Sequence, residues 1–251
     1  MSVLRVRAFA RLCALTCLAA TLLAISPRVA ASPAERAASS PRNDGEVVFY
    51  PPLDRSRPKP LFVMLHGMCG APERTCPYFA ATTERLGWLV CPRAARPCEG
   101  GGTTWSHRER EQTIERAVAR VRAQFPGEID ESAGRTLIGF SLGAFVATDL
   151  AQHPVAGAPY SRVLLIGARV FPDAARLRQA GVERVVFAAG QYDMTYSHMA
   201  EQAKRLRRSG LPSRFIDLGR VGHAFPQDFR EYLEQALLFL GFEATNPVAA
   251  S

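Results

Sequence analysis

A serine flanked by glycines is the most chemically suggestive feature of the sequence. The segment Gly139 to Gly143 has the pattern G-x-S-x-G and lies between an apolar run, Thr136 to Phe140, and an expected helix. In that setting the serine occupies a sharp strand-to-helix turn, and the glycines let strand and helix approach closely. Ser141 is therefore a candidate nucleophile, and the N–H of Leu142 at the helix start is a candidate oxyanion donor. The alternative is a glycine-rich turn with an incidental serine.

A serine hydroxyl needs a base to take its proton and an acid to orient that base. His223 follows the last apolar run, 214–218, in a glycine-containing loop, which makes it the candidate base. Asp193 follows the apolar run 184–189 and is the candidate acid. Asp173 is the alternative acid, whereas Asp217 lies inside an expected strand and is expected to face away. Serine, aspartate and histidine would then follow one another in that chain order.

A second glycine-containing loop, His66 to Gly70, follows the apolar run 61–65. The N–H of Met68 is the natural second oxyanion donor there, and that of Cys69 is the alternative. His66 itself is expected to be structural. The other three histidines of the sequence are expected to be solvated: His107, His153 and His198.

Apolar runs of strand length alternate with amphipathic stretches along the chain. Such alternation predicts an α/β protein with a mostly parallel twisted sheet of about seven or eight strands and helices on both faces. Ligands bind such sheets at the carboxyl ends of the strands, where the four loops above are expected to meet. The expected strands are 47–50, 61–65, 88–91, 136–140, 162–166, 184–189 and 214–218, and the clearest helical faces carry Ile114, Ala117, Val118, Val121 and Phe125, and Phe229, Tyr232, Leu233, Ala236, Leu237 and Leu240.

The spacing of the strands bears on the substrate. Between Ile166 and Arg184 there is room for one short helix, from Phe171 to Ala180, and none for an inserted lid domain. An open, shallow site is expected, suited to soluble or polymer-borne esters. Trp105 is a candidate for stacking on a sugar or an aryl acid, although packing under a glycine-rich loop explains it equally well. The same two interpretations apply to further candidates for the lining of an acyl pocket: Met68, Met194, Tyr196 and Phe225.

The sequence has six cysteines, of which Cys13 and Cys17 lie near the amino terminus. The four others, Cys69, Cys76, Cys91 and Cys98, suggest two disulfides in an exported chain. Short spacing favours pairs between Cys69 and Cys76 and between Cys91 and Cys98, although sequence alone does not determine connectivity. A zinc site is the alternative, but the close C-x-x-C pair that such sites use is missing.

The first 31 residues read as a signal peptide. Three arginines (Arg5, Arg7 and Arg11) precede an apolar stretch, and small residues at 29–31 mark a cleavage site. An uncleaved anchor is the alternative, but the stretch is shorter than the roughly 20 residues of a membrane span. We expect a loose leader at 32–45, the folded domain at 46–245, and export to a periplasm or the cell exterior without stable membrane association.

Composition and charge agree with one globular domain. The chain has 251 residues, 47% of them hydrophobic and 22% charged. The net charge of +8 falls to +4 without the four arginines of the first 31 residues, so nucleic acid is not an expected partner. No metal or organic cofactor is implied, and the oligomeric state is left open.

Taken together, these motifs resemble the α/β-hydrolase superfamily from about Glu46 to Phe242. The resemblance rests on His66-Gly67, the Gly139 to Gly143 elbow, Gly190 to Asp193, and Gly222-His223. It implies a serine esterase with Ser141 as nucleophile, His223 as base and then acid, Asp193 as its partner, and Met68 and Leu142 as oxyanion donors.

Within the superfamily the chain is similar to small esterases related to dienelactone hydrolases, phospholipase/carboxylesterases and secreted polyhydroxybutyrate depolymerase or feruloyl esterase-like proteins. It departs from phospholipase/carboxylesterases around the serine, where they carry a Gln and a second Gly, so acyl-thioester activity is not expected. The expected activity is carboxylic-ester hydrolysis. The alternatives are a serine peptidase of the same fold and a non-catalytic binding protein on a hydrolase scaffold.

Overall fold

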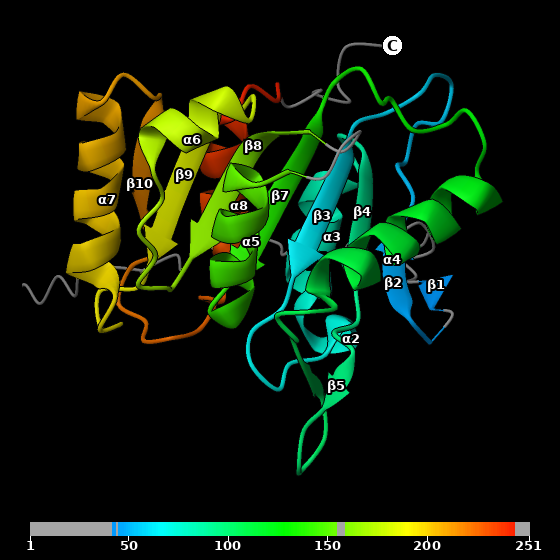
Figure 1. The fold of residues 1–251 in the computed structure, drawn as a ribbon, viewed down its shortest axis with the longest axis horizontal. Helices are drawn as coiled ribbons and strands as arrows, with labels where there is room; N and C mark the ends of the chain where they lie inside the picture. Colours follow the sequence, from blue (N-terminus) through cyan, green and yellow to red (C-terminus); the bar gives the residue numbers. More distant parts are fainter. Residues whose placement is uncertain (1–41, 44, 155–158, 244–251) are drawn as a thin grey trace, which may run out of the picture. The chain divides into compact units, whose positions relative to one another are not determined.

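An eight-stranded sheet forms the centre of the computed structural model, which describes residues 42–43, 45–154 and 159–243 (Figure 1). These residues all belong to the compact unit Pro33–Ser251. The strand order is β1-β2-β4-β3-β7-β8-β9-β10. The strands are β1 (Arg42–Asn43), β2 (Val47–Tyr50), β3 (Leu61–Leu65), β4 (Trp88–Pro92), β7 (Arg135–Phe140), β8 (Tyr160–Ile166), β9 (Arg184–Ala189) and β10 (Ser213–Asp217), and a separate hairpin pairs β5 (Arg96–Pro97) with β6 (Thr103–Thr104).

The sheet is mostly parallel, as the strand sequences predict. The six strands from β4 to β10 in the sheet order run parallel, whereas β2 is antiparallel to β4 and β1 to β2. Every residue of β3 and of β4 is buried, which explains why these strands are apolar without alternation. The carboxyl ends of the parallel strands therefore share one edge.

Helices cover both faces of the sheet. On one face, α4 to α7 pack on strand residues such as Val63, Leu137 and Phe187, and on the other, α3 and α8 pack on Phe62 and Ile138 (Figure 1). No helix in the described part of the chain has both the length and the hydropathy of a membrane span. The helices are α2 (Pro72–Thr75), α3 (Pro77–Thr83), α4 (Arg110–Gln124), α5 (Leu142–Gln152), α6 (Ala174–Gln179), α7 (Tyr196–Arg208) and α8 (Phe229–Phe239).

The structure bears on two expectations about the chain's organisation. The sheet begins at Arg42, four residues before the expected domain start at Glu46. The sequence did not indicate this strand, because two residues show no hydrophobic period. Between β8 and β9 the described residues form only the short helix α6, which matches the expected lidless connection. The predicted signal peptide at 1–31 and most of the expected leader at 32–45 lie outside the described residues.

The two disulfides join different partners from those that spacing favoured. Cys69 pairs with Cys98 and Cys76 with Cys91, with Cα atoms 5.6 and 6.2 Å apart. The predicted pairing of neighbours in sequence is therefore wrong. Its error is topological, because parallel pairing of β3 with β4 brings the loops that follow them together and α3 packs on β4. The disulfides thus tie segments that the sheet already places side by side.

Peptide mapping tests this connectivity. Trypsin places the four cysteines on separate peptides, 56–74, 75–85, 86–93 and 94–108, because Arg or Lys followed by Pro resists cleavage. Without reductant, mass spectrometry is expected to find 56–74 joined to 94–108 and 75–85 joined to 86–93. A linked pair of 56–74 with 75–85 would contradict the structure, and reduced protein serves as the control.

One buried carboxyl lies at the end of α3. Glu84 is 2% exposed, and its Oε1 has no hydrogen-bond partner among the described residues. Burial raises the pKa of this carboxyl to about 7. A group whose folded-state pKa is raised favours folding at low pH, and that contribution is lost as the pH rises from the ordinary value of 4.5 to about 7.

Glu84→Gln is therefore expected to raise Tm at about pH 8.5 by several degrees and to leave it nearly unchanged near pH 4. The upper limit is about 3.5 kcal/mol of unfolding free energy, from a shift of about 2.5 pKa units at about 1.4 kcal/mol each. Thermal unfolding followed by circular dichroism measures both values. Glu99→Gln, at an exposed position in the β5–β6 turn, is the matched control. Equal Tm changes at both pH values would show that the Glu84 charge is not the cause.

Candidate active site

The turn between β7 and α5 holds Ser141 in a strained backbone. Its φ is 54° and its ψ −119°, a conformation that residues other than glycine rarely adopt. The Ser141 N–H donates to the carbonyl of Ile166 at 2.9 Å, which ties the turn to β8. A Cβ at Gly143 would collide with the Leu65 carbonyl oxygen, and one at Gly139 with Ala144. The close approach that the G-x-S-x-G pattern predicts is therefore present.

Two loops at the same edge bring Asp193 and His223 together. Asp193 Oδ2 accepts a hydrogen bond from His223 Nδ1 at 2.7 Å. The Tyr192 N–H donates to Val221 and the Gln191 N–H to Gly219, which joins the two loops along the backbone. Among the acids considered from sequence, the structure therefore places Asp193 beside the histidine.

Asp193 is suited to remain ionised. Burial alone would raise the pKa of this carboxyl, but hydrogen bonds from the Thr195 N–H, 2.8 Å from Oδ1, and from His223 outweigh burial and hold the pKa below its ordinary range. A charged carboxylate accepting from Nδ1–H leaves Nε2 of His223 free to act as an acceptor.

Aromatic and backbone contacts fix the plane of the histidine ring. Phe140, the residue before Ser141, stacks on His223 with ring centroids 4.9 Å apart and 27° between the planes. Phe140 also packs against Phe225 at 4.6 Å. Gly167 lies behind the pair, since a Cβ there would sit 3.0 to 3.2 Å from His223 and Asp193. The stack places the His223 ring beside the strand end that carries the serine.

The loop after β3 lies against the serine. A Cβ at Gly67 would be 3.2 Å from Ser141 Cβ. The N–H groups of Met68 and Leu142, the two predicted oxyanion donors, donate to no other group in the described part of the chain. The Leu142 N–H also opens α5, so the helix dipole adds to its attraction for an anion. Two unengaged donors therefore flank the Ser141 turn.

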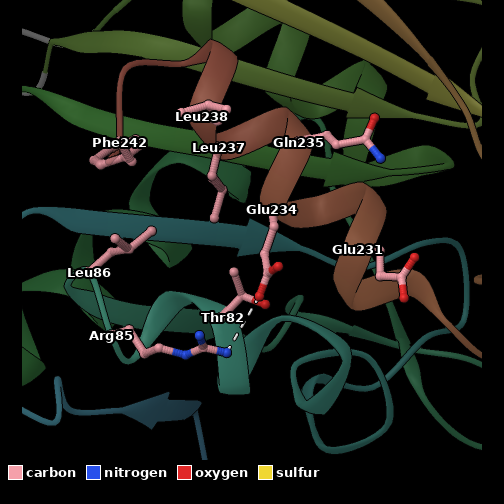
Figure 2. A pocket seen from close by; sticks show the side chains of 9 residues that line it. All are labelled: Thr82, Arg85, Leu86, Glu231, Glu234, Gln235, Leu237, Leu238 and Phe242. Atoms are coloured by element: carbon pink, nitrogen blue, oxygen red, sulfur yellow. Dashed lines mark hydrogen bonds and ion pairs between the residues drawn. The ribbon is translucent and has the colours of Figure 1, made fainter. Parts of the chain in front are cut away.

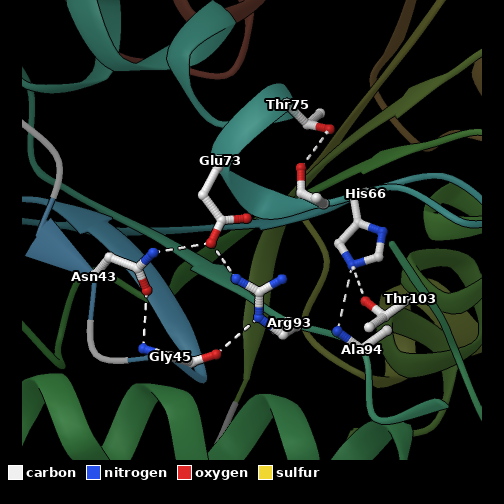
Figure 3. Close-up of polar contacts among 9 residues, drawn as sticks. Asn43, Gly45, His66, Glu73, Thr75, Arg93, Ala94 and Thr103 are labelled. Atoms are coloured by element: carbon white, nitrogen blue, oxygen red, sulfur yellow. Dashed lines mark hydrogen bonds and ion pairs between the residues drawn. The ribbon is translucent and has the colours of Figure 1, made fainter. Parts of the chain in front are cut away.

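Hydrogen bonds of the buried His66 side chain hold this loop in place (Figure 3). Its Nε2 accepts from the Ala94 N–H at 3.3 Å, so Nδ1 carries the proton and donates to the Gly67 carbonyl at 2.8 Å. Burial lowers the pKa of His66, which keeps the ring neutral for these contacts. Near it, Glu73 of α2 accepts a hydrogen bond from Asn43 of β1 and pairs with Arg93, which follows β4 (Figure 3). Glu73 thus joins α2 to β1 and to the end of β4. His66 has the structural role predicted for it.

Trp105 belongs to this support as well. It is 8% exposed, its ring lies 5.0 Å from that of His66, and its indole N–H donates to the His66 carbonyl at 2.8 Å. Of the two interpretations of Trp105, these contacts favour packing under the loop over stacking on a substrate. The Cys69–Cys98 disulfide and a hydrogen bond from the Thr103 N–H to Gly70 hold the same loop.

Other residues singled out in the sequence take varied positions. Met194 is 98% exposed, and Phe225 lies half-buried in the aromatic group beside His223. The Tyr196 hydroxyl donates to the Asp217 carboxylate, a contact within the fold that does not involve the acyl pocket expected from the sequence. Asp173 accepts from the Arg176 N–H and caps α6. His107 and His153 are exposed as expected, whereas His198 is partly buried and bonds the Val170 carbonyl at 2.7 Å.

Sequence reasoning overlooked Phe140 and Gly167. Phe140 stood inside the motif as a variable position, and nothing in its type showed that a loop 83 residues later would stack on it. Gly167 follows β8 directly and has φ of 61°. A glycine at the carboxyl end of a predicted strand was the available signal for a close approach.

A separate cavity lies away from these residues (Figure 2). It holds about 310 Å³ between the end of α3 and α8, with mostly apolar walls crossed by an Arg85–Glu234 ion pair at 3.4 Å. None of the residues around Ser141 lines it. In the described part of the chain, no group of three or more His, Cys, Asp or Glu side chains is placed to hold a metal ion. The residues able to do chemistry gather at the Ser141 turn.

Comparison with known proteins rests on structure. No protein-family model and no curated protein sequence matches the chain. Among solved structures, the esterase PE8 aligns with a TM-score of 0.58 and 19% identity over 76% of this chain and 95% of its own. FphF of Staphylococcus aureus, described as a fluorophosphonate-binding serine hydrolase, aligns with a TM-score of 0.55 and 13% identity over 78% and 92%. The chain has the α/β-hydrolase fold.

A third structure, described as an arylesterase, has a TM-score of 0.57 and 16% identity over 78% of this chain and 81% of its own. Identities this low establish the shared α/β-hydrolase fold and nothing finer. What the site of this chain does must be argued from its own residues.

Proposed function

We propose that the protein is an exported serine hydrolase that cleaves carboxylic esters through an acyl-enzyme. The observation that carries the proposal is the 2.7 Å hydrogen bond from His223 to Asp193 beside the strained turn of Ser141. The His223 ring also stacks on Phe140, the residue before Ser141. The three structural neighbours described as esterases or as a serine hydrolase support it.

Acylation follows from this arrangement. Nε2 of His223 takes the proton of Ser141 Oγ as the oxygen attacks the ester carbonyl carbon. The Met68 and Leu142 N–H groups receive the negative charge that develops on the carbonyl oxygen. The imidazolium of His223, stabilised by the Asp193 carboxylate, then protonates the departing alcohol oxygen, and the acyl group remains on Ser141.

Deacylation repeats these steps with water. His223 accepts a proton from the water that attacks the acyl carbonyl, and the same two N–H groups hold the second oxyanion. Proton return to Ser141 Oγ releases the carboxylic acid and restores the enzyme.

The open surroundings suit small-molecule or polymer-borne esters. The side chain of His223 is 46% exposed, and the only helix described between β8 and β9 is short. Two disulfides fit an oxidising compartment, which supports export to a periplasm or the cell exterior.

Ser141→Ala is expected to lower ester hydrolysis by a factor on the order of a thousand or more, because the nucleophile is lost. Turnover of p-nitrophenyl esters from acetate to palmitate, compared between variant and wild type, measures this. Labelling of wild type by a fluorophosphonate probe, absent in Ser141→Ala, is the parallel readout. Labelled protein that cleaves peptides and no ester would indicate a serine peptidase. Folded protein that is neither labelled nor active would indicate a non-catalytic binding protein.

Gly167→Ala tests the pairing of His223 with Asp193. The added methyl group would press on both side chains, so kcat is expected to fall on the order of tenfold to a hundredfold through misplacement of the base. Gly181→Ala is the matched control, because Gly181 also has a positive φ, 89°, but has open space around it. Both variants should lose about 1 kcal/mol of stability from backbone strain. Equal kcat values in the two variants would count against this arrangement of the site.

A further inference from the structure

The cavity between the end of α3 and α8 has the size and lining of a small-molecule site (Figure 2). Its volume of about 310 Å³ lies at the lower end of the range of roughly 300 to 1,000 Å³ that is typical of ligand pockets. The apolar part of its wall consists of Leu86, Leu237, Leu238 and Phe242. The polar part consists of Thr82, Arg85, Glu231, Glu234 and Gln235. Such a wall suits a compact, mostly apolar molecule.

Packing fixes the apolar wall of this cavity. The Phe242 ring packs on Phe62 with ring centroids 4.8 Å apart, and the Arg162 guanidinium lies over the same Phe242 ring at 5.0 Å. The Leu86 N–H donates to the Thr83 carbonyl at 2.8 Å, which ties Leu86 to the end of α3. A wall that is already in place reduces the entropy lost when a ligand binds.

A buried hydroxyl in this wall has no partner. Thr82 is 5% exposed, and its Oγ1 makes no hydrogen bond within the described part of the chain. Figure 2 shows the Thr82 side chain directed from α3 toward Glu234 of α8, the other residue that lines the cavity at this point. The next residue shows the usual arrangement, because the Thr83 hydroxyl donates to the Phe79 carbonyl at 3.0 Å. A ligand hydroxyl beside Thr82 would supply the partner that a buried polar group requires.

The charges around the cavity favour a neutral ligand. Arg85, the cation of the wall, is already paired with Glu234 at 3.4 Å, so it is not available for an anion. Glu234 also pairs with Arg230 at 2.9 Å, so it is not available for a cation. Glu231 in the wall and Glu243 next to Phe242 are exposed, and water screens their attraction for a cation. The buried part of the wall therefore offers apolar surface and one hydroxyl.

We propose that this cavity binds a neutral, mostly aliphatic molecule that carries a hydroxyl group. Its hydrocarbon part lies against Leu86, Leu237 and Phe242, where apolar area leaves water, and its hydroxyl bonds the hydroxyl of Thr82. None of the residues around Ser141 lines the cavity, so the inference is independent of the proposed ester hydrolysis.

Titration with 1-octanol, followed by isothermal titration calorimetry, tests the site. Saturable binding of about one equivalent is expected. Leu238→Trp places an indole at the cavity and should weaken binding about tenfold or more, because the added rings occupy the space of the ligand. Leu238 is 62% exposed, so the fold has room for the larger side chain. Leu53→Trp, at an exposed leucine outside the cavity, is the matched control and should bind 1-octanol normally.

Thr82→Val tests the hydrogen bond. Binding of 1-octanol is expected to weaken about fivefold, the usual effect of losing one hydrogen bond, whereas Tm without ligand should stay the same or rise because the unbonded hydroxyl is gone. Thr83→Val, the matched control on the same helix, should do the opposite. It removes a hydroxyl that donates to Phe79, so Tm should fall and binding should stay within about twofold.

No binding of 1-octanol, or binding that Leu238→Trp leaves unchanged, would overturn the proposal. Sodium octanoate and octylamine, which have the same chain with a charge at its end, are titrated in parallel. Tighter binding of either ion than of 1-octanol would refute the neutral class of ligand, and unchanged binding by Thr82→Val would refute the role of the hydroxyl. Circular dichroism shows whether Leu238→Trp is folded. If it is not, Gln235→Trp, at another exposed position of the wall, repeats the measurement.

Discussion

The contact between the Ser141 turn and the ends of its neighbouring strands is the constraint on which the rest of the site depends. Ser141 adopts φ of 54° because α5 starts immediately after β7 and because its N–H is bonded to Ile166. Gly143 fits against Leu65 only without a side chain. Since strain of this kind persists only where the surroundings enforce it, the sheet edge and α5 together maintain the turn.

The neighbouring loops depend on that contact in different ways. The Asp193 and His223 loops are joined to each other by backbone bonds and meet the turn through the Phe140 ring. The loop after β3 meets the turn directly at Gly67 and is braced from behind by His66. The His223 side of the candidate site is thus positioned by an aromatic stack, and the Met68 side by buried hydrogen bonds and a disulfide.

Local pattern was sufficient to predict the seven longer strands of the sheet and the residues that follow them. Continuous apolar runs predict long buried strands such as β3 and β9. Because these strands are parallel, the loops that follow them lie at one edge of the sheet. The G-x-S-x-G spacing, Asp193 and His223 could be found this way because each lies next to a recognisable strand.

Features that depend on which strands are neighbours were beyond local pattern. The disulfide partners were mispredicted because Cys98 meets Cys69 only once β3 and β4 are paired. Trp105 looked available for a substrate because its burial comes from His66, 39 positions away. The two-residue strand β1 and the stack of Phe140 on His223 leave no periodic trace in the sequence, since each arises from long-range packing.

The position of Trp105 gives the protein an intrinsic optical reporter. The chain has only two tryptophans, and the indole of Trp88 is bonded to Glu128, at the opposite end of the sheet from Ser141. Trp105 is bonded to the carbonyl of the residue that opens the Met68 loop. Fluorescence from this second indole therefore senses the electric field and the packing beside the loop that carries Met68, so movements of that loop become visible without any attached dye.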